Sequence, residues 1–271
     1  MLLNLKEYLR PKSLKEAWDL YQKNPEHTLF SSGGLSTALR EDERTQVILD
    51  INAVLPKMVE ETPDALFIGG GMTINQIINA LKTHDLTRVF SIVGTNQIRN
   101  MATLSGSIAQ KYGWSDILTA LVAYKAQVQL YNGEQAFYTS IGEYLQSKEP
   151  AVVLGVRIEK KFNFSHFQHL SRTDYDVSQL NYCLCVHLEE DLICESGMAY
   201  GAAPGYAKRL QEVEGILNGL KVSEIQAHLS SILEMTENAT LSDGFGLSGE
   251  YRKELLGVFL KRGLNALEKK G

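Results

Sequence analysis

The chain has 271 residues and a formal net charge of −5, with 44% hydrophobic and 22% charged residues. A chain of this length is expected to form two or three compact units, and its composition is ordinary for a globular protein, so disorder is not the default expectation. The sequence has no block of Lys and Arg and no apolar run near the roughly 20 residues of a membrane span, and its first residues lack an apolar stretch of secretory length. We therefore expect a soluble, cytoplasmic protein that binds no nucleic acid and has no membrane span.

The first 160 residues are predicted to form two α/β lobes, about 1–55 and 56–160. Capping residues and apolar periodicity predict helices at 13–23 and 73–82. Strands are predicted at 27–32, 46–51 and 65–71, a helix followed by a strand within 115–131, and a strand at 135–140 after the Asn132-Gly133 turn. Each lobe therefore contains a strand that ends in adjacent glycines.

The pattern changes near residue 160, where a run of strands is followed by a run of helices. The strands are predicted at 162–170, 181–188 and 192–201, and the helices at 205–218, 222–236 and 248–268. Separate runs of strands and helices are typical of an α+β unit. We therefore predict a second domain at 161–271, after a first domain at 1–160.

Two stretches have the residue types of a ligand site. Gly33 and Gly34 follow a strand directly, which fits either a tight turn or a cradle of N–H groups for an anion. Residues 95–116 gather small and hydroxyl residues around Gly106. Such residues suit a phosphate and a sugar, but a buried loop between capped helices explains them equally well.

Other candidate chemistry is weak. The turn at 69–73 is neither a dinucleotide-binding fingerprint nor a P-loop, and no catalytic triad stands out. His166 and His169 are three residues apart on a strand, so they face opposite sides and cannot share a metal ion. The cysteines fit no common metal-binding spacing and are interpreted as buried thiols, at positions Cys183, Cys185 and Cys194.

Five motifs in order resemble the FAD-binding, or medium, subunit of the molybdenum hydroxylases, of the xanthine dehydrogenase and carbon monoxide dehydrogenase type. YLRPKSLKEA resembles the family's opening Y-x-R-P-x-S-x-x-E-A, and SGGLST stands where the family has A-G-G-T-D-L. QIRNMATLSGSI, with WSD after it, resembles Q-I-R-N-x-x-T-x-G-G-N. LSRTDYDVSQLN and SGEYR resemble R-x-x-D-x-A/S and the closing S-x-x-Y-R.

The resemblance implies an α+β, FAD-binding PCMH-type fold. Two α/β lobes would be followed by a C-terminal three-stranded antiparallel sheet with a layer of three helices. The cofactor would be FAD, held by its pyrophosphate on the backbone N–H groups of two glycine-rich loops. The implied residues are Ser31, Ser32, Gly33, Gly34, Leu35, Ser36 and Thr37 in the first loop, Thr103, Ser105, Gly106 and Ser107 in the second, and Val93, Asp116, Val153 and Gln168.

Individual roles follow from the same resemblance. Asp116 would contact the polar tail of the flavin, and Val153 would lie near its isoalloxazine ring. Gln168 stands where some members carry a lysine near that ring. The sequence departs from the family pattern at Leu35, Ser36, Ser105 and Ser107, and lost polar side chains of this kind weaken binding by about 0.5–1.5 kcal/mol each.

The implied function is electron transfer. Electrons from a molybdenum-cofactor subunit would pass through an iron–sulfur subunit to FAD on this chain and then to an acceptor such as NAD⁺. The substituted loop residues keep open an alternative, a degenerate family member that binds FAD weakly or not at all and serves in assembly. A stand-alone flavin oxidoreductase is the third hypothesis.

Overall fold

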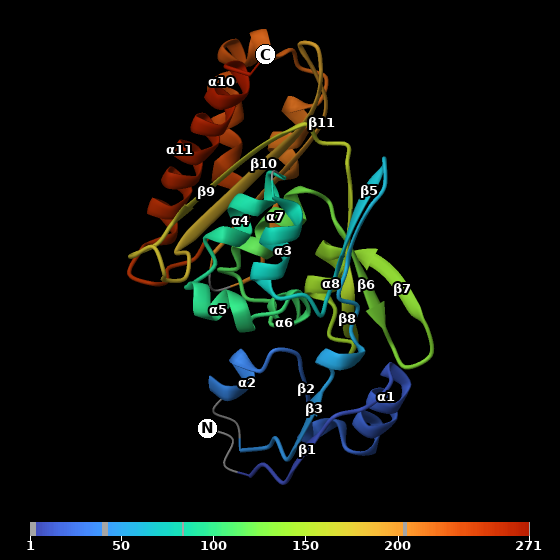
Figure 1. The fold of residues 1–271 in the computed structure, drawn as a ribbon. Helices are drawn as coiled ribbons and strands as arrows, with labels where there is room; N and C mark the ends of the chain where they lie inside the picture. The colour runs from blue at the N-terminus through green and yellow to red at the C-terminus, as the bar shows by residue number, and fades with distance from the viewer. Residues whose placement is uncertain (1–3, 40–42, 83, 203–204, 271) are drawn as a thin grey trace. The chain divides into compact units, whose positions relative to one another are not determined.

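The computed structural model describes residues 4–39, 43–82, 84–202 and 205–270 (Figure 1). The chain divides into two compact units, each built from stretches that are distant in sequence. The first unit is drawn from Met1–Thr62, Leu66–Gln110 and Gln127–Arg157. The second unit is drawn from Pro63–Ala65, Lys111–Ala126 and Ile158–Gly271.

The N-terminal lobe of the first unit has a small parallel sheet. Its strands are β1 (Glu7–Leu9), β2 (Thr28–Ser31) and β3 (Val47–Asp50), in the order β1-β3-β2. Helix α1 (Leu14–Lys23) begins after Ser13, whose side chain accepts a hydrogen bond from the N–H of Glu16, as the sequence predicts. The other helices of this lobe are α2 (Leu35–Leu39), η1 (Pro25–His27) and η2 (Asn52–Val54).

Trp18 of α1 is the centre of a small apolar core in this lobe. Its ring stacks on Phe30 at 6.2 Å between centroids and meets the edge of Tyr131 at 6.2 Å. Tyr131 belongs to a strand of the next lobe, so the two lobes of the first unit share this core.

The second lobe is built around a five-stranded sheet in the order β4-β5-β8-β6-β7. Its strands are β4 (Val59–Glu61), β5 (Ala65–Gly69), β6 (Gln127–Tyr131), β7 (Ala136–Ser140) and β8 (Val152–Glu159). Its helices are α3 (Ile74–Leu81), α4 (Leu86–Ser91), α5 (Asn96–Met101), α6 (Leu104–Ala109) and α8 (Ile141–Gln146). Thr73 caps α3 as predicted, with Gln76 completing a capping box.

The second unit contains an antiparallel sheet of four strands in the order β12-β11-β10-β9. The strands are β9 (Phe164–Leu170), β10 (Leu180–Glu189), β11 (Leu192–Gly201) and β12 (Lys208–Arg209). The helices are α7 (Asp116–Ala123), α9 (Gln211–Leu217), α10 (Ile225–Glu234) and α11 (Gly249–Glu268), with the short 3-10 helices η3 (Val222–Glu224) and η4 (Met235–Asn238).

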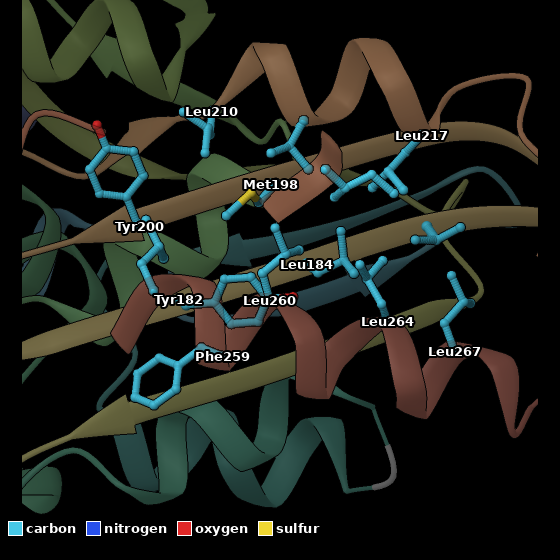
Figure 2. Packing of buried hydrophobic residues seen from close by; sticks show 14 of the residues in the cluster. Tyr182, Leu184, Met198, Tyr200, Leu210, Leu217, Phe259, Leu260, Leu264 and Leu267 are labelled. Carbon is cyan, nitrogen blue, oxygen red and sulfur yellow. The ribbon is translucent and has the colours of Figure 1, made fainter. Parts of the chain in front are cut away.

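Helices cover both faces of this sheet. Figure 2 shows Leu260, Leu264 and Leu267 of α11 directed at the sheet residues Leu184 and Met198 in a buried apolar core. The opposite face lies against α7, where a Cβ atom on Gly197 would come within 2.0 Å of the carbonyl oxygen of Ala123. The position of Gly197 thus allows α7 to pack closely on β11.

The predicted α+β fold is confirmed, including the three C-terminal strands and the three helices after them. Strand β12 was not predicted, because two residues carry no alternating pattern. The helix expected from residue 205 begins only at Gln211, because Lys208 and Arg209 pair with Tyr200 and Ala199 of β11. In the part of the chain that the structure describes, no helix has both the length and the apolar character needed to cross a membrane.

Candidate functional site

The first candidate loop leaves β2 at Ser31 and passes through two glycines in the left-handed region. Gly33 has a φ of 86° and Gly34 a φ of 75°, values that favour glycine. Helix α2 starts at Leu35, so Ser36 lies in its first turn, and the hydroxyl groups of Ser31 and Thr37 lie 3.1 Å apart across the loop. The glycines thus turn the chain sharply from strand to helix.

The two glycines differ in their surroundings. A Cβ atom on Gly33 would lie 2.2 Å from the carbonyl oxygen of Met101, so no side chain fits there without displacing the backbone. A Cβ atom on Gly34 would meet no described atom within 4 Å. Gly33 is therefore a close-packing position, whereas the backbone at Gly34 is open on the side where a side chain would stand.

The second candidate segment lies beside the first. Thr103 Oγ1 is 2.9 Å from both the carbonyl oxygen and the hydroxyl of Ser32. A Cβ atom on Gly106 would lie 3.2 Å from the same Ser32 carbonyl. The structure therefore brings together two segments that are 71 residues apart in sequence.

The resemblance implies a glycine-rich loop at the second segment. In the structure this segment is the start of helix α6. Thr103 is its N-cap and accepts a hydrogen bond from the N–H of Gly106 at 3.2 Å. The N–H groups of the next residues also have acceptors inside the protein: Leu104 bonds Met72 O, Ser105 bonds Gly70 O, and Ser107 bonds Thr103 O. The backbone donors implied for a phosphate at this segment are thus already engaged.

The glycines after β5 serve packing. Gly70 donates to Leu154 O of β8 at 2.7 Å, and a Cβ atom on it would lie 2.8 Å from Val153 O. Val153 itself is buried in β8. The turn thus allows close contact with β8 and also supplies the Gly70 carbonyl that accepts from Ser105, so it positions the start of α6.

Val93 lies in the turn after α4, which Arg99 holds in place. The Arg99 guanidinium donates to Val93 O at 3.1 Å and to Gly94 O at 2.7 Å, and its Nε donates to Asn75 Oδ1 at 3.3 Å. Arg99, part of the Q-I-R-N motif, therefore fixes the backbone around Val93.

Asp116 lies in the second unit, at the start of α7, and its carboxylate is part of a polar network. Ser178 Oγ donates to Asp116 Oδ1 at 2.7 Å and Asn181 Nδ2 donates to the same oxygen at 2.8 Å. Thr119 bonds Asn181 at 2.7 Å, and His169 Nδ1 lies 3.1 Å from Ser178 Oγ. Sequence reasoning missed these partners because they are between 9 and 65 residues apart.

Gln168 lies on β9 of the same sheet but on its other face. It pairs with Tyr182, whose neighbours on that face belong to the core under α11, whereas His169 and Asn181 face α7. The predicted residues Asp116 and Gln168 are therefore on opposite faces of the sheet, and their contacts with a flavin stay predictions. The opposite orientation of His166, against Gly263 of α11, and His169, against Ser178, agrees with the sequence prediction.

The burial of Asp116 leads to a pH-dependent stability. Burial raises the pKa of its carboxyl above the ordinary value, against the hydrogen bond from Ser178, the charge of His169 and the hydrogen bond from Asn181, which all lower it. A raised pKa in the folded state means that stability falls as the pH rises from about 4 through that folded pKa. Asp116→Asn keeps an oxygen for both hydrogen bonds and removes the titration.

We compare the free energy of unfolding of Asp116→Asn with that of the wild type. The variant is expected to be more stable relative to the wild type at pH 7 than it is at pH 4. Urea unfolding of both proteins at the two pH values measures this difference of differences. An equal gap at pH 4 and pH 7 would contradict the buried-carboxylate account. Asp176→Asn is the matched control, because the hydrogen bond from the Arg172 side chain lowers the pKa of that half-buried carboxyl and so gives the opposite sign.

Known protein families match nearly the whole chain. Residues 3–158 match the family model for the FAD binding domain in molybdopterin dehydrogenase, and residues 165–267 match that for the CO dehydrogenase flavoprotein C-terminal domain. The nicotine 6-hydroxylase medium subunit of Paenarthrobacter nicotinovorans is 25% identical, with 94% of each chain covered. The xanthine dehydrogenase FAD-binding subunit of Escherichia coli O157:H7 is 24% identical, with 96% of this chain and 95% of that one covered.

Solved structures share the fold. A chain of carbon monoxide dehydrogenase from Hydrogenophaga pseudoflava superimposes with a TM-score of 0.88 at 18% identity, covering 98% of each chain. A chain of quinoline 2-oxidoreductase from Pseudomonas putida 86 superimposes with a TM-score of 0.85 at 17% identity, covering 100% of this chain and 99% of that one. The family model covers more than half of the sequence, so this chain belongs to the family of FAD-binding flavoprotein subunits of the molybdopterin dehydrogenases.

Proposed function

We propose that this chain binds the FAD pyrophosphate at the Gly33-Gly34 loop and conducts electrons from an iron–sulfur subunit to an acceptor such as NAD⁺. The hydroxylation itself belongs to a molybdenum-cofactor subunit of the same complex. The observation that carries the proposal is the junction of Ser32 and Thr103, which fixes this loop against α6 while Gly34 stays open.

The residues at this junction fit a pyrophosphate group. Fewer backbone N–H donors are available to it than the resemblance implies. The amides of residues 104–107 are engaged, so backbone donation falls to the first loop. Gly34 has a positive φ and open space beside it, and the first N–H groups of α2, directly after it, have no partners within that helix. Adjacent N–H groups in such a turn form an anion-binding concavity.

The second segment has a supporting role in this proposal. Thr103 holds Ser32, and through it the first loop, at a fixed place relative to α6. Loss of the polar side chain expected at Leu35 removes one contact but no backbone donor. FAD, when bound, supplies the redox chemistry, and the chain's task is to hold it and exclude other orientations.

The visible absorption spectrum of the purified chain, before and after addition of FAD, tests cofactor binding. We expect a flavin spectrum that stays with the protein through gel filtration and raises its melting temperature. If neither the chain alone nor the chain purified with its partner subunits releases flavin on denaturation, the proposed site is overturned.

Electron flow requires the assembled complex. The complex, reduced by the substrate of its molybdenum-cofactor subunit, is expected to form NADH with FAD present. After the flavin is removed, the iron–sulfur clusters are expected to become reduced without forming NADH. NADH formation that continues without flavin would contradict electron transfer through this chain. Clusters that stay reduced in the presence of both FAD and NAD⁺ would exclude NAD⁺ as the acceptor.

A further inference from the structure

The tip of the β10–β11 hairpin gathers three side chains of different metal-binding chemistry. His187 and Glu189 lie two residues apart on β10, and Cys194 follows on β11. The prediction of a buried thiol is wrong for Cys194, which is exposed, whereas Cys183 and Cys185 are buried. One ligand atom from each, a ring nitrogen, a carboxylate oxygen and the thiol sulfur, lie within 4.8 Å of one another. His187 Nε2 and Glu189 Oε1 are 3.1 Å apart.

A β-bulge brings the cysteine into this group. His187 pairs with Glu195 and Leu188 pairs with Ile193, which leaves Cys194 as the extra residue of β11. Such a bulge redirects a side chain and is characteristic of functional positions in sheets. Without it, strict alternation would place residue 194 on the face opposite its neighbour 195.

The histidine is oriented as a metal ligand. Its Nδ1 hydrogen-bonds the backbone carbonyl of Lys161, and because a carbonyl only accepts, Nδ1 carries the proton. Nε2 is therefore the nitrogen directed at Glu189. A ligating histidine characteristically donates its other ring N–H to a carbonyl or carboxylate in this way, which fixes both tautomer and ring orientation.

The backbone between the ligands is also held. Asn163 bonds both polar groups of Leu188, accepting from its N–H at 2.9 Å and donating to its carbonyl at 2.7 Å. In the turn, Asp191 accepts from Ser223 Oγ at 2.6 Å and from its N–H at 3.1 Å. The hairpin tip is thus fixed from both sides, and each carboxylate oxygen of Asp191 already accepts a hydrogen bond.

The neighbouring charges select which groups can coordinate. Glu195 faces the same side as His187, but it already binds Lys125 at 2.6 Å and Lys161 at 2.8 Å. Among the described residues, Glu189 forms its ion pair with His187, at 3.1 Å, and not with a lysine. The Glu189 carboxylate is therefore neutralised by no lysine in the described part of the chain, and it faces the histidine nitrogen that a cation would also contact.

We propose that His187, Glu189 and Cys194 form a binding site for a divalent, thiophilic cation, with Zn²⁺ as the best match. Nitrogen, oxygen and sulfur together are the donor set of Zn²⁺, whereas Mg²⁺ and Ca²⁺ prefer oxygen alone. Ligand atoms on a tetrahedral Zn²⁺ lie about 3.5 Å apart, so small rotations of the exposed Glu189 and Cys194 close the site. Three protein ligands leave a fourth position for water.

Co²⁺ is the probe for this site, because a cobalt–thiolate bond gives a charge-transfer absorption band. The full chain is stripped with a chelator, titrated with Co²⁺, and then challenged with Zn²⁺. We expect one Co²⁺ per chain with a thiolate band, and loss of the band when Zn²⁺ displaces the cobalt. Absence of the band at saturating Co²⁺ would overturn the site.

Variants assign the ligands. Cys194→Ser is expected to remove the band, and His187→Gln to weaken binding at least about tenfold. His228→Gln, an exposed histidine on α10, and Cys183→Ala, a buried thiol, are matched controls expected to leave the band unchanged. A band that survives in Cys194→Ser, or that disappears in Cys183→Ala while the melting temperature is retained, would overturn this ligand set.

Discussion

Gly33→Ala is expected to lower the free energy of unfolding by about 2–5 kcal/mol and to reduce FAD affinity at least about tenfold. Its added methyl group would lie 2.2 Å from the carbonyl oxygen of Met101, on a backbone with a φ of 86°. Because the obstacle is backbone, the loop must move away from α5 and α6. That movement breaks the contacts between Ser32 and Thr103 on which the proposed site depends.

Two further glycines separate the stability effect from the binding effect. Gly34→Ala meets no described atom, so we expect a loss of about 1–2 kcal/mol from its positive φ alone. Its methyl group would occupy the open side proposed for the pyrophosphate, so FAD affinity is expected to fall at least as much as in Gly33→Ala.

Gly142→Ala is the matched control. Gly142 lies in α8, has open space around it and no positive φ, and alanine there is expected to be neutral or stabilising by up to about 1 kcal/mol. Urea unfolding and flavin titration of the three variants give both quantities. If Gly34→Ala leaves FAD affinity unchanged, the pyrophosphate does not lie at this loop.

Arg252→Met is expected to lower the free energy of unfolding by about 2–5 kcal/mol. Arg252 is fully buried in α11, and its guanidinium donates to Ser242 O at 2.8 Å and to Gly244 O at 2.5 Å. Methionine fills a similar volume but leaves both carbonyl groups without these donors. Burial also lowers the pKa of this arginine, although Asp243 opposes the shift.

The arginine has a second consequence in the loop that it holds. Phe245 in this loop has a φ of 51°, meets the edge of Trp114 at 5.9 Å, and accepts a hydrogen bond from Gln179 at 2.5 Å. We expect Arg252→Met to speed limited proteolysis within residues 242–247.

Arg262→Met, at an exposed position of the same helix, is the control, with an expected change within about 0.5 kcal/mol. Equal stability of the two variants would show that the buried arginine does not hold the loop.

Local features of the fold were readable from the sequence. The caps at Ser13, Thr73, Ser115 and Ser248 each depend on a side chain that bonds a backbone N–H three residues later, so short sequence windows contain the information. The strands of the second unit were predicted because they are long enough to show apolar runs.

The candidate site was only partly predictable from the sequence, because its contacts join residues that are far apart in the chain. Thr103 was singled out for its hydroxyl group, but its two partners, the capped helix α6 and Ser32, were not predictable locally. A six-residue helix has too few turns for periodicity, and a contact across 71 residues depends on the folded arrangement. Likewise, Arg252 was found in the S-x-x-Y-R motif, but its role requires the loop that precedes it in the folded chain.

The assignment of Lys111–Ala126 to the second unit constrains how this protein can be divided or recombined. A fragment that starts near residue 161 lacks α7, so Cys183, Asn181 and the small residues of β11 would face water and invite aggregation. Chimeras with a relative should therefore exchange 111–126 together with the C-terminal segment. During synthesis, α7 leaves the ribosome before the strands of the sheet that it covers. Its packing face therefore stays uncovered until those strands have been made.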